Sequence, residues 1–424
     1  MLEFKLNQEK DSFIINFVVP VDKDSCNHKD FKLFSEIFID KYKCTFDYEN
    51  DHITAISGKL EFLVDIADQW LTKKEAAVQK LIIDELLTKN FIQKEGLQVN
   101  FHQNPFDNSF RYWNFILNQG SFLRYFYNRV NWFIAPKYNI VTPFPLHVDI
   151  ESSSTCNMNC PMCYRDQLKE TGQMDYGLFK KIVDECADNN VFSIRLSWRG
   201  ETLTHPKITD MIAYACNKIT NVSFLTNAFY IDDRIAECCI DNKVSYLAIS
   251  FDGIGNVYES IRHPAKFKEN YNRIANLKRK RDEKKSDYPQ IRLCTIWPAI
   301  KMDPKQYTRT MKSVSDYIVC NPYINFKGPM VIKPDFICQY PWERIVIAFN
   351  GKAQCCTGWN ADDIILENVT EKSIVEMWNS DHMTEVRNLH KQGNRMSLNS
   401  CANCRHGSKG DPDINIWDIL KRQY

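Results

Sequence analysis

The chain has 424 residues, enough for two or three domains with buried cores. With 44% hydrophobic and 25% charged residues, the composition is typical of a globular protein and excludes a disordered or collagenous one. The 54 Lys and Arg residues nearly balance the 53 Asp and Glu residues, so no net field favours nucleic acid or an anionic membrane as a partner. A basic run at 278–285 lies on a predicted helix with interspersed acids, which is more typical of a solvated face than of a nucleic-acid site.

The sequence begins without the basic and apolar segments of a signal peptide, and no stretch approaches the roughly 20 apolar residues of a membrane span. We therefore expect a cytoplasmic protein. Sixteen cysteines in such a chain indicate thiols and metal ligands rather than a disulfide framework. Cysteines outside the two groups described below are expected to be small buried hydrophobes.

Residues 1–142 carry no recognisable motif and are predicted to form an N-terminal α/β domain. Aromatic and branched residues predict strands at Phe13–Pro20 and Leu60–Asp65, and apolar spacing predicts a helix over Lys73–Leu87. Aromatic and arginine residues are dense from Phe110 to Phe133. They could stack on a ligand or partner, but a helix that packs its aromatic face onto the next domain is the favoured interpretation.

Pro143 and Pro145 mark a domain boundary, after which strands and helices alternate through residues 143–333. Strands are predicted at 146–150, 192–197, 222–225, 246–250 and 291–296, with helices at 174–189, 208–218, 232–241 and 269–285. This alternation predicts βαβ units and a parallel sheet, which right-handed crossovers would curl into a partial or full barrel. Ligands of such sheets bind at the carboxyl ends of the strands.

The first cysteine group lies directly after the first of these strands, where Cys156, Cys160 and Cys163 have the spacing C-x3-C-x2-C. Three thiolates on one loop can bind three irons of a cubane cluster and leave the fourth iron open. An open position lets a small molecule bind the metal, as in catalytic metal sites.

Small and polar residues end the next three strands, where a core would need apolar ones. These ends are Arg199–Thr202, Thr226–Asn227 and Ser250–Gly253. Because the carboxyl ends of parallel strands share one edge of a sheet, we expect them to lie beside the cysteine loop.

The cysteine spacing and the three strand ends together resemble those of the radical S-adenosylmethionine (radical SAM) superfamily, over about 143–408 of this chain. The resemblance implies a partial (β/α)6 barrel in which the three cysteines hold a [4Fe-4S] cluster that binds S-adenosylmethionine (SAM). In that family SAM is cleaved reductively, and the 5′-deoxyadenosyl radical removes a hydrogen atom from the substrate. The resemblance also implies an electron donor such as flavodoxin or ferredoxin.

The same resemblance implies the residues that contact SAM. Glu201, which follows Gly200, corresponds to the acid that pairs with the methionyl ammonium, and a desolvated ammonium does need a fixed carboxylate. Met162 stands where the family often has an aromatic residue near the adenine. Contacts to the ribose or carboxylate correspond to Ser250 and Asp252, with Asn227 as a weaker candidate. No catalytic acid or base is assigned.

Residues 334–424 have a different pattern and are predicted to form a cysteine-rich C-terminal domain. A strand at 344–349, a hairpin turn at Asn350–Gly351 and a helix at 373–390 lie between the cysteines Cys338, Cys355, Cys356, Cys401 and Cys404. Four thiolates, one of them from the adjacent pair, would complete a closed site. Neighbouring strand residues face opposite sides, so the sequence leaves the choice between Cys355 and Cys356 open.

The spacing of this second group fits a four-cysteine zinc site as well as an iron-sulfur cluster. Its order resembles the SPASM or twitch extension of radical SAM maturases: a cysteine, a proline-tryptophan pair, a hairpin ending in cysteine, a helix and C-x2-C. That resemblance implies one auxiliary [4Fe-4S] cluster, since no cysteine follows Cys404, and it puts Cys355 at the usual place after the hairpin.

We therefore expect a radical SAM oxidoreductase or maturase whose auxiliary cluster accepts or relays an electron from the substrate radical. A peptide or protein substrate is favoured, and the N-terminal domain could recognise it. The alternative is dehydrogenation or rearrangement of a sugar, aminoglycoside or nucleotide. A hypothesis from another class is a catalytically silent iron-sulfur or zinc protein that has kept the fold for binding.

Overall fold

In the computed structural model the chain is described at 3–7, 12–16, 45–49, 52–59, 115, 118–120, 125, 128, 131–132, 135–136 and 139–409, except 322, 325, 327–330 and 359–361. It divides into two compact units. One consists of residues 1–100 with 121–137, and the other of residues 101–120 with 138–424.

The first unit contains an antiparallel sheet in the order β1-β2-β4-β3. Its strands are β1 (Glu3–Asn7), β2 (Ser12–Asn16), β3 (Thr45–Glu49) and β4 (His52–Lys59). β2 overlaps the strand predicted at Phe13–Pro20. The strand predicted at Leu60–Asp65 and the helix predicted over Lys73–Leu87 lie outside the described residues.

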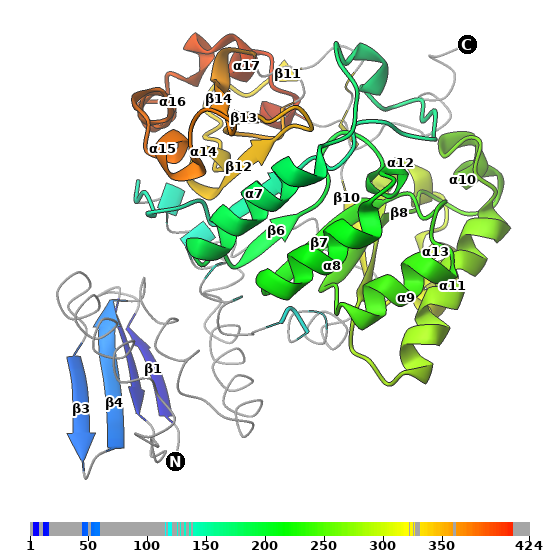
Figure 1. Cartoon of the computed structure of the whole chain (residues 1–424), viewed down its shortest axis with the longest axis horizontal. Helices are drawn as coiled ribbons and strands as arrows, with labels where there is room; N and C mark the ends of the chain where they lie inside the picture. Colours follow the sequence, from blue (N-terminus) through cyan, green and yellow to red (C-terminus); the bar gives the residue numbers. More distant parts are fainter. Residues whose placement is uncertain are drawn as a thin grey trace. The chain divides into compact units, whose positions relative to one another are not determined.

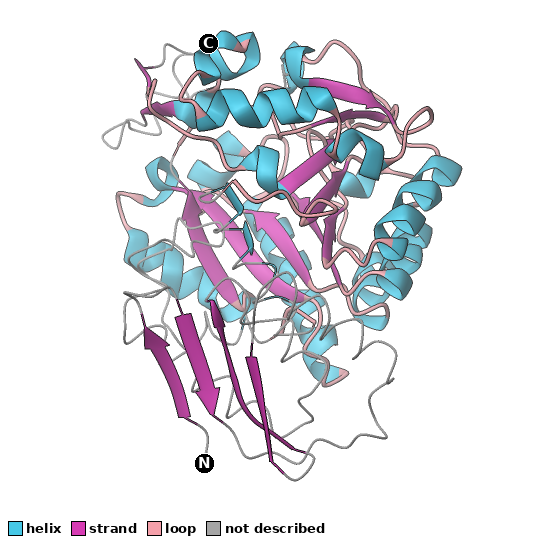
Figure 2. Cartoon of the chain, turned by 90° about the vertical axis from the view of Figure 1, so that its left-hand side faces the viewer, coloured by secondary structure: helices cyan, strands magenta, loops and turns pink. Residues whose placement is uncertain are grey.

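The second unit is built on a nine-stranded sheet in the order β10-β9-β8-β7-β6-β5-β12-β13-β14. β5 to β10 are parallel, and they are β5 (His147–Ile150), β6 (Ser193–Arg195), β7 (Asn221–Thr226), β8 (Tyr246–Ser250), β9 (Gln290–Ile296) and β10 (Tyr317–Asn321). Helices follow these strands and pack along the outside of the sheet (Figures 1 and 2). The predicted partial (β/α)6 barrel is thereby confirmed.

The helices of the barrel are α7 (Tyr176–Asp188), α8 (Ile208–Lys218), α9 (Asp233–Asp241), α10 (Asn256–Ile261), α11 (Phe267–Glu283), α12 (Trp297–Ile300) and α13 (Pro304–Met311). Local signals set several of their starts. Asp175 caps α7 by accepting a hydrogen bond from the Leu178 N–H, and Asp232 caps α9 by accepting one from the Ile235 N–H. Each helix turns an apolar face to the core, as with Phe179, Ile182, Val183 and Cys186 of α7.

Basic residues of α11 pair with acids, as expected for a solvated face. Lys278 contacts Asp282 at 2.5 Å, and Lys280 contacts Glu237 of α9 at 2.7 Å. Most of the aromatic stretch 110–133 lies outside the described residues. Phe115 is buried and stacks on Tyr317 with ring centroids 5.5 Å apart, which agrees with the packing interpretation at that position.

The C-terminal part of the chain adds three strands to the same sheet. They are β12 (Arg344–Ile347), which runs parallel to β5, and the antiparallel β13 (Lys352–Gln354) and β14 (Ile365–Asn368). The predicted turn at Asn350–Gly351 joins the first two, and Gly351 has a φ of 85° that suits glycine. β11 (Val331–Ile332) and β15 (Ser408–Lys409) form a separate two-stranded pair.

Helices α14 (Tyr340–Glu343), α15 (Ile374–Trp378), α16 (Asp381–Lys391) and α17 (Asn399–Ala402) gather around this hairpin (Figure 1). The prediction of one helix over 373–390 is wrong, because Asn379 ends α15 and the Ser380 side chain caps α16 by accepting from the Met383 N–H. Short 3-10 helices are η3 (Arg165–Gln167), η4 (Thr202–Thr204), η5 (Lys312–Val314), η6 (Asp362–Ile364), η7 (Arg395–Ser397) and η8 (Arg405–Gly407).

A buried ionic network joins β5, β6 and β12 where the hairpin meets the barrel. The Asp149 carboxylate is fully buried and lies 2.7 Å from Arg195 Nε, 3.0 Å from Arg344 Nη1 and 3.0 Å from His147 Nε2. Burial alone would raise the pKa of Asp149, but the Arg195 guanidinium and its other neighbours hold that pKa well below its usual range. The carboxylate therefore stays charged and ties the three strands together.

Candidate functional site

The loop that follows β5 carries the first cysteine group and is anchored on two sides. The Ser154 hydroxyl accepts a hydrogen bond from the Gly172 N–H at 2.7 Å. The Asn159 N–H donates to the His263 carbonyl at 2.8 Å, which ties the loop to the segment after α10. The loop is therefore held at the carboxyl end of the sheet, where the sequence predicts a ligand site.

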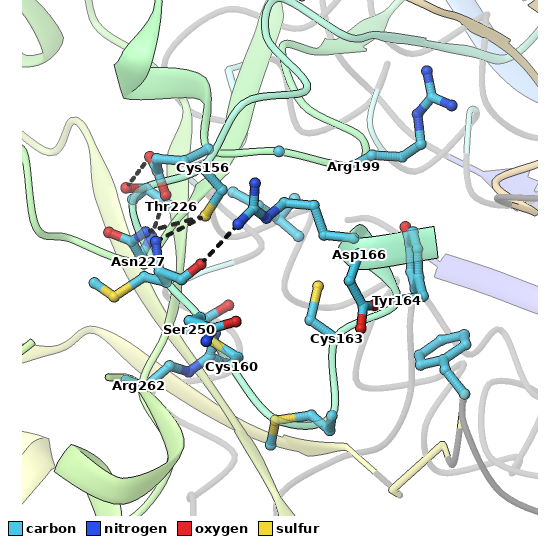
Figure 3. Close-up of a pocket in the computed structure, with 18 of the residues that line it drawn as sticks. Cys156, Cys160, Cys163, Tyr164, Asp166, Arg199, Thr226, Asn227, Ser250 and Arg262 are labelled. Carbon is cyan, nitrogen blue, oxygen red and sulfur yellow. Dashed lines mark hydrogen bonds between the residues drawn. The ribbon is translucent and has the colours of Figure 1, made fainter. Parts of the chain in front are cut away.

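Cys156, Cys160 and Cys163 line one cavity of about 260 Å³, drawn in Figure 3. The walls also include five of the residues expected to contact SAM, which are Met162, Gly200, Glu201, Asn227 and Ser250. They come from the cysteine loop and from the ends of β6, β7 and β8, as the rule for parallel sheets predicts. Asp252 is not among the lining residues.

Glu201 is the buried carboxylate of the cavity wall, with 3% of the residue exposed. It accepts hydrogen bonds from the Thr226 hydroxyl at 2.7 Å, from the Asn227 N–H at 2.7 Å and from the Leu203 N–H at 3.2 Å. Burial nevertheless raises the pKa of Glu201 to about 7. The charged form would gain from a cation in the cavity, because the described neighbours that bind the carboxylate are neutral donors.

Gly200 brings the end of β6 against the cysteine loop more closely than another residue would allow. A Cβ at this position would lie 2.5 Å from the Ser153 carbonyl oxygen and 2.6 Å from the Thr155 carbonyl oxygen. The approach lets the Glu201 N–H donate to the Thr155 carbonyl at 2.8 Å. The glycine thereby sets Glu201 beside Cys156.

Hydrogen-bond donors surround the sulfur atoms of the loop. Cys156 Sγ accepts from the Met158 N–H at 3.4 Å, and Asn227 Nδ2 lies 4.0 Å from the same sulfur (Figure 3). Burial raises the pKa of Cys156 to about 11. A thiol in such a place becomes a thiolate when a metal coordinates it, so the donor set fits a metal-bound cysteine.

Asp252 lies behind the cavity wall and acts through Arg262. Arg262 Nε donates to the Asp252 carboxylate at 2.8 Å, and Arg262 Nη1 lies 3.7 Å from Cys160 Sγ. The Asp252 carboxylate also accepts from the Ile296 N–H at 2.9 Å. Arg262 was not predicted from the sequence, although a buried aspartate in a strand-end motif signals that some cation must compensate it.

The wall on the side of Tyr164 is aromatic and is tied to the second cysteine group. The rings of Tyr164 and Phe326 pack edge to face, with their centroids 5.0 Å apart. The Arg199 guanidinium lies 3.8 Å from the Trp198 ring and makes two hydrogen bonds to Glu151, at 2.8 and 2.6 Å. Trp198 Nε1 donates to the carbonyl of Thr357 at 3.0 Å, directly after Cys356.

In the second cysteine group the Cys356 thiol acts on the pKa values of Cys338, Cys401 and Cys404, and Cys355 is its neighbour. The pKa of Cys338 lies well above its usual value, and that of Cys401 is about 12. Burial is the main cause of both shifts, and the nearby Cys356 thiol raises both pKa values further. Cys404 adds to both shifts. Cys355 is fully buried and belongs to the hydrophobic core of the unit.

Two kinds of donor reach the sulfurs of this group. The Gly358 N–H donates to Cys356 Sγ at 3.2 Å, within the turn that follows the hairpin. His390 Nε2 lies 3.5 Å from Cys401 Sγ. Backbone and imidazole N–H groups that point at cysteine sulfur stabilise the thiolate form, as iron-sulfur ligands require.

Among the described residues, no three His, Cys, Asp or Glu side chains converge closely enough to hold one metal ion. In a cubane cluster each thiolate binds a different iron, so its ligands surround a larger group than a single ion. None of the described helices has the length and apolar character needed to cross a membrane.

Family comparisons cover both cysteine groups. Residues 150–287 match the radical SAM superfamily, and residues 338–405 match SPASM, an iron-sulfur cluster-binding domain. The chain belongs to the radical SAM superfamily. The SPASM match confirms the predicted SPASM or twitch subgroup.

Curated relatives align with different shares of this radical SAM chain. The antilisterial bacteriocin subtilosin biosynthesis protein AlbA of Bacillus subtilis (strain 168) is 31% identical over 123 residues, 28% of this chain and 27% of AlbA. The S-adenosyl-L-methionine-dependent 2-deoxy-scyllo-inosamine dehydrogenase of Niallia circulans is 21% identical over 268 residues, 62% of this chain and 93% of the dehydrogenase. The chain thus spans about a quarter of AlbA but nearly all of the dehydrogenase.

Among solved structures, BtrN in complex with AdoMet and 2-DOIA is 17% identical, with a TM-score of 0.44, covering 61% of this chain and 92% of BtrN. Streptococcus suis SuiB bound to the precursor peptide SuiA is 12% identical, with a TM-score of 0.49, covering 73% of this chain and 80% of SuiB.

The radical SAM domain implies SAM and a [4Fe-4S] cluster, and the SPASM domain implies an auxiliary iron-sulfur cluster. These expected cofactors are confirmed at the level of the family. The residues present fit them, because the three loop cysteines open onto one cavity that also holds a buried carboxylate. The second group offers four thiols with N–H donors directed at their sulfurs.

Proposed function

We propose that this protein cleaves SAM reductively and uses the radical to oxidise a peptide or protein substrate. The observation that carries the proposal is the gathering of Cys156, Cys160, Cys163 and Glu201 around one cavity at the carboxyl ends of the barrel strands. When bound there, the cluster and SAM supply the hydrogen-abstracting radical. The chain binds and orients them and excludes water and oxygen.

In this proposal the three loop cysteines bind three irons, and Glu201 accepts the methionyl ammonium of SAM. Arg262, which the Asp252 carboxylate holds in the cavity wall, is one cation that the cavity offers to the methionyl carboxylate. Gly200 positions Glu201, and Met162 offers an apolar contact to the adenine. Ser250 and Asn227 are polar groups within the same cavity and suit the ribose.

The proposed auxiliary cluster has four ligands, which are Cys338, Cys356, Cys401 and Cys404. Cys356 is the proposed fourth ligand, rather than Cys355, because its thiol acts on the pKa values of the other three, whereas Cys355 is buried in the apolar core. Four protein ligands leave this cluster no open iron for the substrate. A cluster held by these four cysteines would accept the electron that a substrate radical gives up, so that the net reaction would be an oxidation.

A peptide substrate is supported by AlbA, the relative of highest identity reported above, whose name makes it a bacteriocin biosynthesis protein. Residues 1–142 would then form a domain that recognises the peptide, ahead of a barrel at 143–333 and a cluster domain at 334–424. A low-potential donor such as flavodoxin or ferredoxin would supply the electron. Sixteen cysteines and two reduced clusters suit a reducing compartment, the cytoplasm.

The second candidate function is dehydrogenation of a small polyol, sugar or aminoglycoside. It is supported by the alignment over 93% of the 2-deoxy-scyllo-inosamine dehydrogenase. The two candidates differ in what accompanies the gene: a short peptide gene beside it supports the first, and sugar or aminoglycoside genes support the second.

The test of SAM cleavage is anaerobic reconstitution with iron and sulfide, reduction with dithionite, and measurement of 5′-deoxyadenosine. We expect the reduced protein to form 5′-deoxyadenosine and methionine from SAM. The matched control is Cys160→Ala, which removes one ligand of the cleaving cluster and leaves the second cysteine group intact. No 5′-deoxyadenosine from protein that holds both clusters would overturn the enzyme proposal in favour of a binding protein.

A further inference from the structure

His390 connects two segments of the second cysteine group. It lies on the buried face of α16 together with Met383, Val386 and Arg387, at the spacing that places residues on one side of a helix. Only 2% of His390 is exposed. No role follows from its position in the sequence, since it lies outside the C-x2-C motif.

The two ring nitrogens of His390 have different partners. Nδ1 accepts a hydrogen bond from the Cys338 N–H at 3.4 Å, so Nδ1 carries no proton. In the neutral ring the proton is then on Nε2, which lies 3.5 Å from Cys401 Sγ. The hydrogen bond therefore runs from the imidazole N–H to the sulfur, and the Cys338 N–H fixes its direction.

A buried cation accompanies this hydrogen bond. Arg395 is 2% exposed, and its guanidinium donates to the carbonyls of Cys401 at 2.5 Å, Lys333 at 2.5 Å and Gly407 at 3.4 Å. Within the described ranges no carboxylate forms an ion pair with it. A buried guanidinium bound only to neutral carbonyls is costly unless an anion lies near, and four thiolates around a cluster would supply that anion.

Hydrogen bonds to cluster sulfur and nearby positive charge both stabilise the reduced form, which carries one more negative charge. We propose that His390 sets the reduction potential of the auxiliary cluster by donating its Nε2–H to the Cys401 thiolate. This inference rests on the proposed function, because it requires that the second cysteine group holds a [4Fe-4S] cluster. The cluster takes up one electron, no bond is formed or broken, and the imidazole keeps its proton.

The role proposed for His390 follows from the direction of the effect. A raised potential makes the auxiliary cluster a better acceptor of the electron from a substrate radical. The raised potential also sets the auxiliary cluster apart from the SAM-cleaving cluster, which must give up its electron. His390 is thus a positioning and potential-setting residue, and it does not touch the reacting atoms.

The test is a redox titration of the full-length reconstituted protein, followed by electron paramagnetic resonance, with dithionite as the reductant. In His390→Leu we expect the reduction equilibrium of the auxiliary cluster to become about tenfold less favourable, which corresponds to about 59 mV for one electron. The SAM-cleaving cluster in the same sample should keep its potential and serves as the internal control.

Two further variants sharpen the test. His390→Gln keeps an N–H donor of similar reach, so the potential of its auxiliary cluster should lie close to the wild-type value. His382→Leu removes an imidazole about 12 Å away along the same helix and should leave both potentials unchanged.

Unchanged potentials in His390→Leu would overturn the inference. Loss of about four irons from both His390 variants would also overturn it, since His390 would then be a ligand. Wild-type protein with about four irons would instead refute the proposed auxiliary cluster, so the two failures can be told apart.

Discussion

Glu201 is the residue whose charge state should control SAM binding. Burial raises its folded-state pKa to about 7, so the carboxylate is largely protonated below that pH and charged above it. Only the charged form can pair with an ammonium. We expect the SAM dissociation constant to rise about tenfold as the pH falls from 8 to 6, measured anaerobically by isothermal titration calorimetry.

Glu201→Gln keeps the size of the side chain and removes its charge. SAM affinity should fall about tenfold or more at pH 8 and lose its dependence on pH, while the cluster absorbance is retained. Glu259→Gln alters a partly exposed acid that pairs with Lys266 and should bind SAM like the wild type. Equal affinity in Glu201→Gln and wild type would show that another group binds the ammonium.

The sequence predicts which residues belong to the site better than it predicts their contacts. Cys156 and Glu201 were found because ligand spacing and strand ends are local features. Arg262 was missed, since the partner of a buried aspartate is chosen by the fold among many arginines. The sequence does not distinguish Cys355 from Cys356, because the side of the sheet that each side chain faces depends on how the hairpin joins the sheet.

Among the elements, β5, β6 and β12 meet at the buried Asp149 carboxylate. Asp149→Asn removes the charge that compensates Arg195 and Arg344, so both guanidinium groups lose an anionic partner in the interior. We expect the free energy of unfolding to fall by about 3–5 kcal/mol, measured by urea denaturation under anaerobic conditions.

The matched control is Glu283→Gln, which breaks the exposed pair between Glu283 and Arg279 on α11. Its effect should stay within about 0.5 kcal/mol, because exposed ion pairs contribute little. Equal stabilities of the two variants would mean that the Asp149 network does not hold the hairpin to the barrel.

Helices and strands were predictable where the spacing of apolar residues and the capping or turn residues at their ends indicated the same element. α8 and β8 have the predicted bounds, and the other predicted barrel elements differ at their ends by one or two residues. The error at 373–390 has a physical cause. The apolar period continues through Asn379 and Ser380, but Ser380 offers a better cap than a helix interior, so the chain starts a new helix there.

In the second unit as a whole, strands that lead into the two cysteine groups belong to one sheet. β5 precedes the first group, β12 and β13 precede Cys356, and β12 is paired with β5. Trp198 extends this link, since it lines the cavity and its ring N–H donates to the Thr357 carbonyl. The change of composition near Pro334 predicts a domain boundary there, whereas pairing between distant strands leaves no local signal in the sequence.

The iron content of the whole protein tests this two-site arrangement. Reconstituted wild type should contain about eight irons per chain, with four in each cluster. Cys356→Ala should retain about four irons and still cleave SAM, because the barrel keeps its three cysteines. Cys355→Ala removes a neighbouring core thiol and should keep about eight irons, which makes it the matched control. If Cys355→Ala were the variant that lost four irons, the fourth ligand would be Cys355. Wild type with about four irons and one zinc would mean that the second group holds zinc, which cannot accept an electron.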